Sequence, residues 1–128
     1  MRLQLDVSAG ELVDRITILE LKLKRLPQVY RVELQLTLDR ACRVLDQAMQ
    51  PSQRLHELVG ALRAVNSELW DTEEELRCCE RRRDFGEHFV QLARTVYIAN
   101  DRRAALKSEI DSLSGYGVRE LKSYALPE

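Results

Sequence analysis

The feature that most constrains the fold is a pair of long apolar stripes separated by a short break at residues 84–86. On both sides of the break, apolar side chains recur at spacings of three, four and seven, which places one stripe along each of two helices. The stripes consist of Leu55, Leu58, Leu62, Val65, Leu69 and Leu76, and of Phe85, Phe89, Leu92, Val96, Ala99, Leu106, Ile110 and Leu113. Because the break is short, we expect the two helices to pack antiparallel as a long hairpin.

Polar side chains interrupt both stripes. At about 100° per residue, Asn66 and Glu73 fall within the first stripe, and Asn100, Arg103 and Lys107 fall within the second. Counting back from the break brings Asn66 and Glu73 within roughly two turns of Asn100 and Arg103. The sequence therefore predicts that a carboxylate, two amides, a guanidinium and an ammonium group meet between the helices.

Two interpretations of this polar cluster remain open. In the structural one, a buried Glu73–Arg103 ion pair with amide partners fixes the register of the hairpin, because a buried charge must be paired. In the other, Arg103 and Lys107 bind an anionic ligand and Glu73 is a base or a metal ligand. The candidate residues for either role are Asn66, Glu73, Arg94, Tyr97, Asn100, Arg103 and Lys107.

The rest of the chain completes an all-α fold. Ser8-Ala9-Gly10-Glu11 has the pattern of a capping box that opens a helix, and Pro27 ends that helix. We expect one domain over residues 1–128, an antiparallel bundle of four helices at about 8–26, 29–49, 52–83 and 86–114, with a C-terminal strap at 116–128. At 1.5 Å per residue, the third helix is roughly 45 Å long and the first roughly 27 Å. The long hairpin should therefore overhang the first two helices, and its exposed stripe predicts a homodimer.

Charge and hydropathy exclude several classes of protein. The formal net charge is −1, so nothing in it attracts nucleic acid, and no apolar run approaches the roughly 18 residues that span a bilayer. The first six residues have no signal-peptide pattern, and three cysteines without zinc-site spacing are typical of reduced thiols. We expect a cytoplasmic protein without membrane insertion.

Two pairs of carboxylates with ExxD spacing, Glu11/Asp14 and Glu68/Asp71, are secondary candidates for a Mg²⁺ site. Glu11-Leu12-Val13-Asp14 is similar to one motif of the all-helical nucleotide pyrophosphohydrolases, but the acidic EExxE segment that should precede it is missing. These pairs support an alternative in which the chain is a small enzyme or binding protein for a phosphorylated metabolite, such as a nucleotide or nucleotide-sugar. We expect no cofactor otherwise, and Mg²⁺ enters only under that alternative. No glycine-rich phosphate loop, nucleophile elbow or HExxH motif occurs in the sequence, so we assign no enzymatic activity.

Several motifs together resemble a bacterial family of short helical proteins of unknown function. They are the segments 7–20 (VSAGELVDRITILE), 66–71 (NSELWD), 92–97 (LARTVY), 100–104 (NDRRA) and 122–124 (KSY). Some members of that family are free-standing, and others are attached to glycosyltransferase-like or repeat-containing proteins of surface-polysaccharide loci. The resemblance implies a bacterial origin and a partner enzyme such as a glycosyltransferase, and it brings no catalytic residues. The function we expect is that of a dimeric helical interaction or accessory module, serving surface-polysaccharide biosynthesis.

Overall fold

The computed structural model describes residues 1–115. Its elements are α1 (Ala9–Arg25), a short 3₁₀ helix η1 (Gln28–Tyr30), α2 (Arg31–Ala48), α3 (Gln53–Arg82) and α4 (Glu87–Ser114). The described part of the chain contains no strand, which confirms the predicted all-α class. The segment expected to form one helix at 29–49 starts instead with the 3₁₀ turn. The predicted strap at 116–128 lies outside the described residues.

The helix ends follow from local chemistry. The amide of Glu11 donates to the Ser8 hydroxyl at 3.2 Å, so one half of the predicted capping box is present at the start of α1. The Glu11 carboxylate, which would form the other half of the capping box, pairs instead with Lys107 on α4. Ser52 caps α3 in the same way, with its hydroxyl accepting from the amide of Leu55 at 3.0 Å. At the other end of α3, Arg83 takes a left-handed conformation and turns the chain toward α4.

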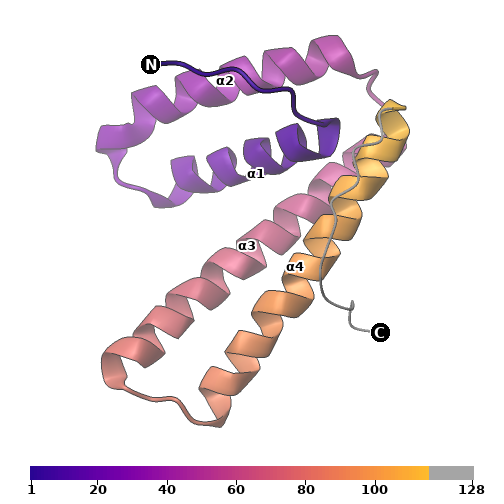
Figure 1. The fold of residues 1–128 in the computed structure, drawn as a ribbon. Coiled ribbons are helices and arrows are strands. Elements are labelled where there is room, and N and C mark those ends of the chain that lie inside the picture. Colours follow the sequence, from indigo (N-terminus) through magenta and orange to yellow (C-terminus); the bar gives the residue numbers. More distant parts are fainter. Residues whose placement is uncertain (116–128) are drawn as a thin grey trace.

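The four helices form two hairpins of unequal length (Figure 1). In the long hairpin, α3 and α4 pack side by side along their lengths, as predicted. In the short hairpin, α2 packs against α1, and α1 in turn packs against both α3 and α4. The short hairpin lies over the end of the long one that is far from its turn, and the buried core is found there: Val13, Leu55, Leu58, Leu62 and Ile110.

The end of the long hairpin near its turn extends beyond α1. With 30 residues, α3 is roughly 45 Å long, against roughly 26 Å for the 17 residues of α1. Under α1 the apolar residues of α3 are buried, since Leu58 is 3% exposed and Leu62 0%. Toward the turn, Leu69 and Leu76 are only partly buried, whereas Thr72 and Cys79 stay buried. We call this end of the long hairpin, residues 69–82 of α3 and 87–98 of α4, the open half.

Candidate functional site

A two-pronged ion pair joins α1 to α4. The Arg103 guanidinium donates from Nε to Asp14 Oδ1 at 2.9 Å and from Nη2 to Asp14 Oδ2 at 2.5 Å. The side chain of Asp14 is 6% exposed and that of Arg103 is 30% exposed. Such a planar fork on a carboxylate is the strongest common form of charge-assisted hydrogen bond. It fixes the position of α1 across the long hairpin.

Asn66 adds the third helix to this network. Its side-chain amide donates to Asp14 Oδ1 at 2.9 Å and to the Thr17 hydroxyl at 2.8 Å. The Thr17 hydroxyl donates in turn to the backbone carbonyl of Asp14 at 2.8 Å. Both Asn66 and Thr17 are buried, so these hydrogen bonds satisfy groups that would otherwise be costly to remove from water.

The network also sets the charge state of Asp14. Burial acts to raise the pKa of this carboxyl, but hydrogen bonds from Arg103 and Asn66 and the positive charges of Arg103 and Lys107 outweigh burial. The pKa of Asp14 is therefore held below its ordinary value. The group stays ionised, as its pairing with Arg103 requires.

A second set of contacts holds the start of α1 on α4. Lys107 is buried and its Nζ lies 2.6 Å from Oε1 of Glu11. The amide of Gly10 donates to Oδ1 of Asp111 at 2.7 Å. A Cβ atom on Gly10 would lie 2.3 Å from the carbonyl oxygen of Lys107, so only glycine allows this approach of the two backbones.

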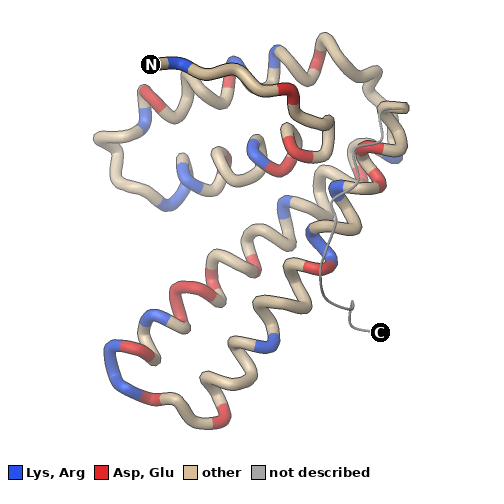
Figure 2. The backbone as a smooth tube through the Cα atoms, in the orientation of Figure 1, with Lys and Arg blue, Asp and Glu red and all other residues tan. Residues whose placement is uncertain are grey.

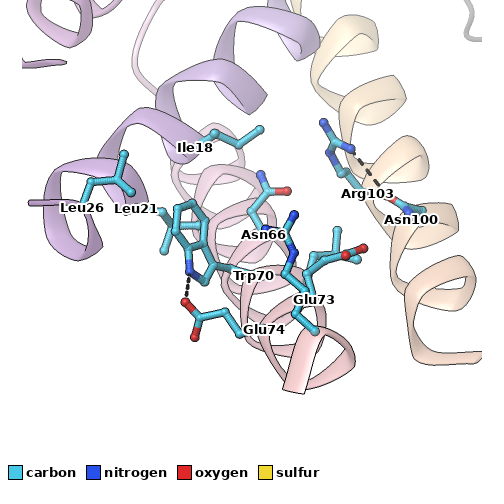
Figure 3. Close-up of a pocket in the computed structure, with 11 residues that line it drawn as sticks. Ile18, Leu21, Leu26, Asn66, Trp70, Glu73, Glu74, Asn100 and Arg103 are labelled. Atoms are coloured by element: carbon cyan, nitrogen blue, oxygen red, sulfur yellow. Dashed lines mark hydrogen bonds between the residues drawn. The ribbon is translucent and has the colours of Figure 1, made fainter. Parts of the chain in front are cut away.

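The structure brings part of the predicted polar cluster together. Asn66, Asn100 and Arg103 meet as expected, with Arg103 Nη1 donating to Asn100 Oδ1 at 3.4 Å. The carboxylate that pairs with Arg103 in this bidentate way is Asp14, rather than the expected Glu73. Glu73 is exposed and lies on the wall of a groove (Figure 3).

Arg94 and Tyr97 lie away from the network. Nε of Arg94 donates to the Tyr97 hydroxyl at 3.4 Å, and both side chains are exposed on α4.

Sequence reasoning gave no role in the network to Thr17 and considered Asp14 only as a metal ligand. The missed signal is the spacing of Gly10, Asp14, Thr17 and Leu21, at intervals of four, three and four, which places them on one face of α1. All four are buried.

Each carboxylate of the two ExxD pairs is engaged by a cation of another helix. Glu11 pairs with Lys107 and Asp14 with Arg103, while Asp71 pairs with Arg25. The remaining carboxylate, Glu68, lies 2.7 Å from Nη2 of Arg102. Within residues 1–115, no three side chains of His, Cys, Asp or Glu are grouped as a metal site requires.

A groove of about 600 Å³ opens beside the network, in the angle between the C-terminal half of α1 and the open half (Figure 3). It is lined by Ile18, Leu21, Leu26, Asn66, Leu69, Trp70, Glu73, Glu74, Arg77, Asn100 and Arg103. A smaller groove of about 360 Å³ shares Glu73 and Arg77 with it and continues toward the turn. Its other lining residues are Leu76, Glu80, Phe89, Ala93 and Val96. We call the α3 and α4 residues of these two grooves, from Leu69 and Val96 to the turn, the open face.

The open face has an apolar floor and charged walls of both signs. Leu69, Leu76, Phe89 and Val96 are half-buried along the floor, and Glu73, Arg77 and Glu80 stand exposed on the α3 side. Trp70 forms part of the wall next to α1, where its indole N–H donates to Glu74 at 2.8 Å. This mixture suits a partner that is itself partly apolar and carries charges of both signs.

Comparisons of this chain with models of known protein families, with curated proteins and with solved structures find no match. No helix among residues 1–115 is both long enough and apolar enough to cross a membrane.

Proposed function

We propose that this protein is a helical interaction module, an accessory protein that binds other proteins through the open face. The observation that carries the proposal is the change in burial along the long hairpin. Where α1 covers it, Leu62 and Ile110 are fully buried, whereas the apolar side chains of the open face, Leu76, Phe89 and Val96, are only half-buried. An apolar surface with a polar rim is typical of a protein-binding site.

The network supports the same function, because it holds the short hairpin at one end of the long hairpin and so leaves the open face accessible. Asp14, Asn66 and Arg103 tie three helices together at the edge of the open face. Arg103 already donates two hydrogen bonds to Asp14, which is a structural use of its guanidinium fork.

The resemblance described above suggests what the partners are. We propose a cytoplasmic homodimer that serves an enzyme of surface-polysaccharide biosynthesis, such as a glycosyltransferase. A long helical hairpin with one bare face can hold a second protein chain and leave the rest of its surface for the enzyme.

A second candidate function rests on the contents of the larger groove. Arg77 and Arg103 can donate to a phosphate, and the Trp70 ring can stack on a base or sugar. The protein would then bind a phosphorylated metabolite such as a nucleotide-sugar, with or without Mg²⁺. Glu73 and Glu74 on the same groove repel an anion, so this function ranks second. A ligand-dependent rise in Tm that Arg77→Ala abolishes would favour it.

Photo-crosslinking tests the interaction module directly. A photoreactive side chain is placed at Phe89 in the open face, or at Tyr30 in η1 as a control, and the chain is irradiated in the cells that produce it. Tyr30 is 50% exposed and lies at the far end of the short hairpin. We expect covalent adducts with protein from position 89 and few from position 30. Equal yields from the two positions would contradict the proposal.

A further inference from the structure

We propose that the open face binds a second copy of this chain, with the two α3 helices antiparallel across a two-fold axis. The open halves of the two long hairpins then form a four-helix bundle, and each short hairpin lies at an opposite end of it. This inference rests on the proposed function above, since it names the partner of the same surface.

The shape of the protomer determines the direction of packing. The groove shared by α1 and the open half has Glu73 and Arg77 on its wall, and the same two residues line the groove nearer the turn. The short hairpin and the open face are therefore on one side of the long hairpin. Two open faces can meet without a clash only if the two short hairpins point to opposite ends. The two-fold axis must then lie between the two faces and perpendicular to the helices. Rotation about such an axis packs α3 against the partner's α3 and α4 against the partner's α4.

Charge complementarity supports a second copy. Glu73 and Arg77 are four residues apart on one side of α3, and both are exposed. Within residues 1–115 neither side chain forms an ion pair or hydrogen bond. An antiparallel copy centred near Glu75 places Glu73 opposite Arg77 of the partner subunit, and Arg77 opposite the partner's Glu73. One two-fold axis thus makes two equivalent ion pairs.

The position of Ala93 on α4 is consistent with the same two-fold axis. Glu75 and Ala93 both lie about two turns from the tip of the hairpin, one on α3 and the other on α4. The axis that centres α3 on Glu75 therefore passes close to Ala93. A small side chain at this point lets two α4 helices approach closely, with Phe89 and Val96 on either side of the contact.

The charge on α3 also changes sign along its length. Figure 2 shows acidic positions in the middle of α3 giving way to basic positions at the turn. Glu73, Glu74 and Glu75 make the acidic segment, and Arg81, Arg82 and Arg83 make the basic one. With the axis near Glu75, Arg77 is the cation of each copy that faces the acidic segment of the other, and the basic turn lies level with the partner's residues 67–69.

Reversal of the two charges tests the arrangement. The full chain, its Glu73→Arg variant and its Arg77→Glu variant are each studied by light scattering after gel filtration. We expect wild type at twice 14.9 kDa. We expect each variant alone to raise the dissociation constant by about tenfold or more, because two attractive pairs become two repulsive ones. An equimolar mixture of the two variants should dimerise again, since position 73 of each then faces the opposite charge at position 77 of the other.

Two controls distinguish loss of the interface from a general effect of charge or a loss of the fold. Glu33→Arg makes the same charge change on exposed α2 and should leave the mass unchanged. Circular dichroism of each variant checks that the fold is intact. A dimer that both reversals leave unchanged, or single variants that fail to pair when mixed, would overturn the proposed register. A wild-type monomer at every soluble concentration would overturn the inference as a whole. The proposed function would survive a monomer if position 89 still crosslinks to a different protein, and it would fall if that position crosslinks to none.

Discussion

Asp14 on α1 and Arg103 on α4 are 89 residues apart in the chain and form a bidentate ion pair, with N–O distances of 2.9 and 2.5 Å. Asn66 on α3 donates to the same carboxylate. These three side chains define how the short hairpin is attached to the long one. The attachment also determines which part of the long hairpin remains uncovered.

Asp14→Asn tests the energetic role of this pair. The substitution keeps the volume of the side chain but leaves the Arg103 charge without its carboxylate. Breaking a buried pair costs about 3–5 kcal/mol, and Arg103 is partly exposed, so we expect the free energy of unfolding to fall by about 2–3 kcal/mol. Urea denaturation measures it. The control is Asp71→Asn, which removes an exposed partner of Arg25 and should cost much less. Equal losses in the two variants would contradict a special role for Asp14.

The pH dependence of stability follows from the same group. The pKa of Asp14 is lower in the folded protein than in the unfolded chain, so on acidification the unfolded state takes up the proton first. The stabilisation is fully present above the unfolded pKa of about 4 and is lost as the pH falls through the folded pKa. Urea midpoints of wild type and Asp14→Asn, compared from neutral to acidic pH, should converge as the pH falls. A difference that stays constant over this range would refute the linkage.

Two glycine substitutions make a matched test of the α1–α4 contact. Gly10→Ala places a Cβ atom against the carbonyl of Lys107, which must move, and we expect a loss of about 3 kcal/mol, the upper end of the usual cost of overpacking. Gly60→Ala is a helical position with nothing within 4 Å, and alanine should stabilise it by about 0.5–1 kcal/mol. Thermal unfolding compares them. A neutral Gly10→Ala would mean that the two backbones are not in close contact.

The long hairpin could be predicted from the sequence because the features that determine it are local. Apolar spacing identifies α3 and α4, and the short break between them makes them neighbours. Counting residues from that break then brings Asn66 close to Arg103, which the structure confirms through their shared contact with Asp14. The helix lengths also predicted that the hairpin would extend beyond α1.

The carboxylate that pairs with Arg103 could not be predicted from the sequence in the same way. Counting residues from the break places Glu73 on α3 close to the level of Arg103 on α4. Asp14, by contrast, comes from α1, and the position of α1 depends on how the two hairpins pack together. Spacing within a helix shows that Asp14 and Thr17 share the buried face of α1, and it does not show which helix they face. The same applies to Lys107, whose partner Glu11 was expected to cap α1.

The claim that the open face binds protein is tested most directly by sedimentation velocity of the fluorescently labelled chain in an extract of its own cells. Val96→Arg places a charge on the floor of the open face, and Leu113→Arg, at a 45% exposed apolar position near the other end of α4, is the control. We predict that wild type and Leu113→Arg sediment faster than a 14.9 kDa monomer, and that Val96→Arg sediments as the monomer. Equal sedimentation of all three would contradict the account.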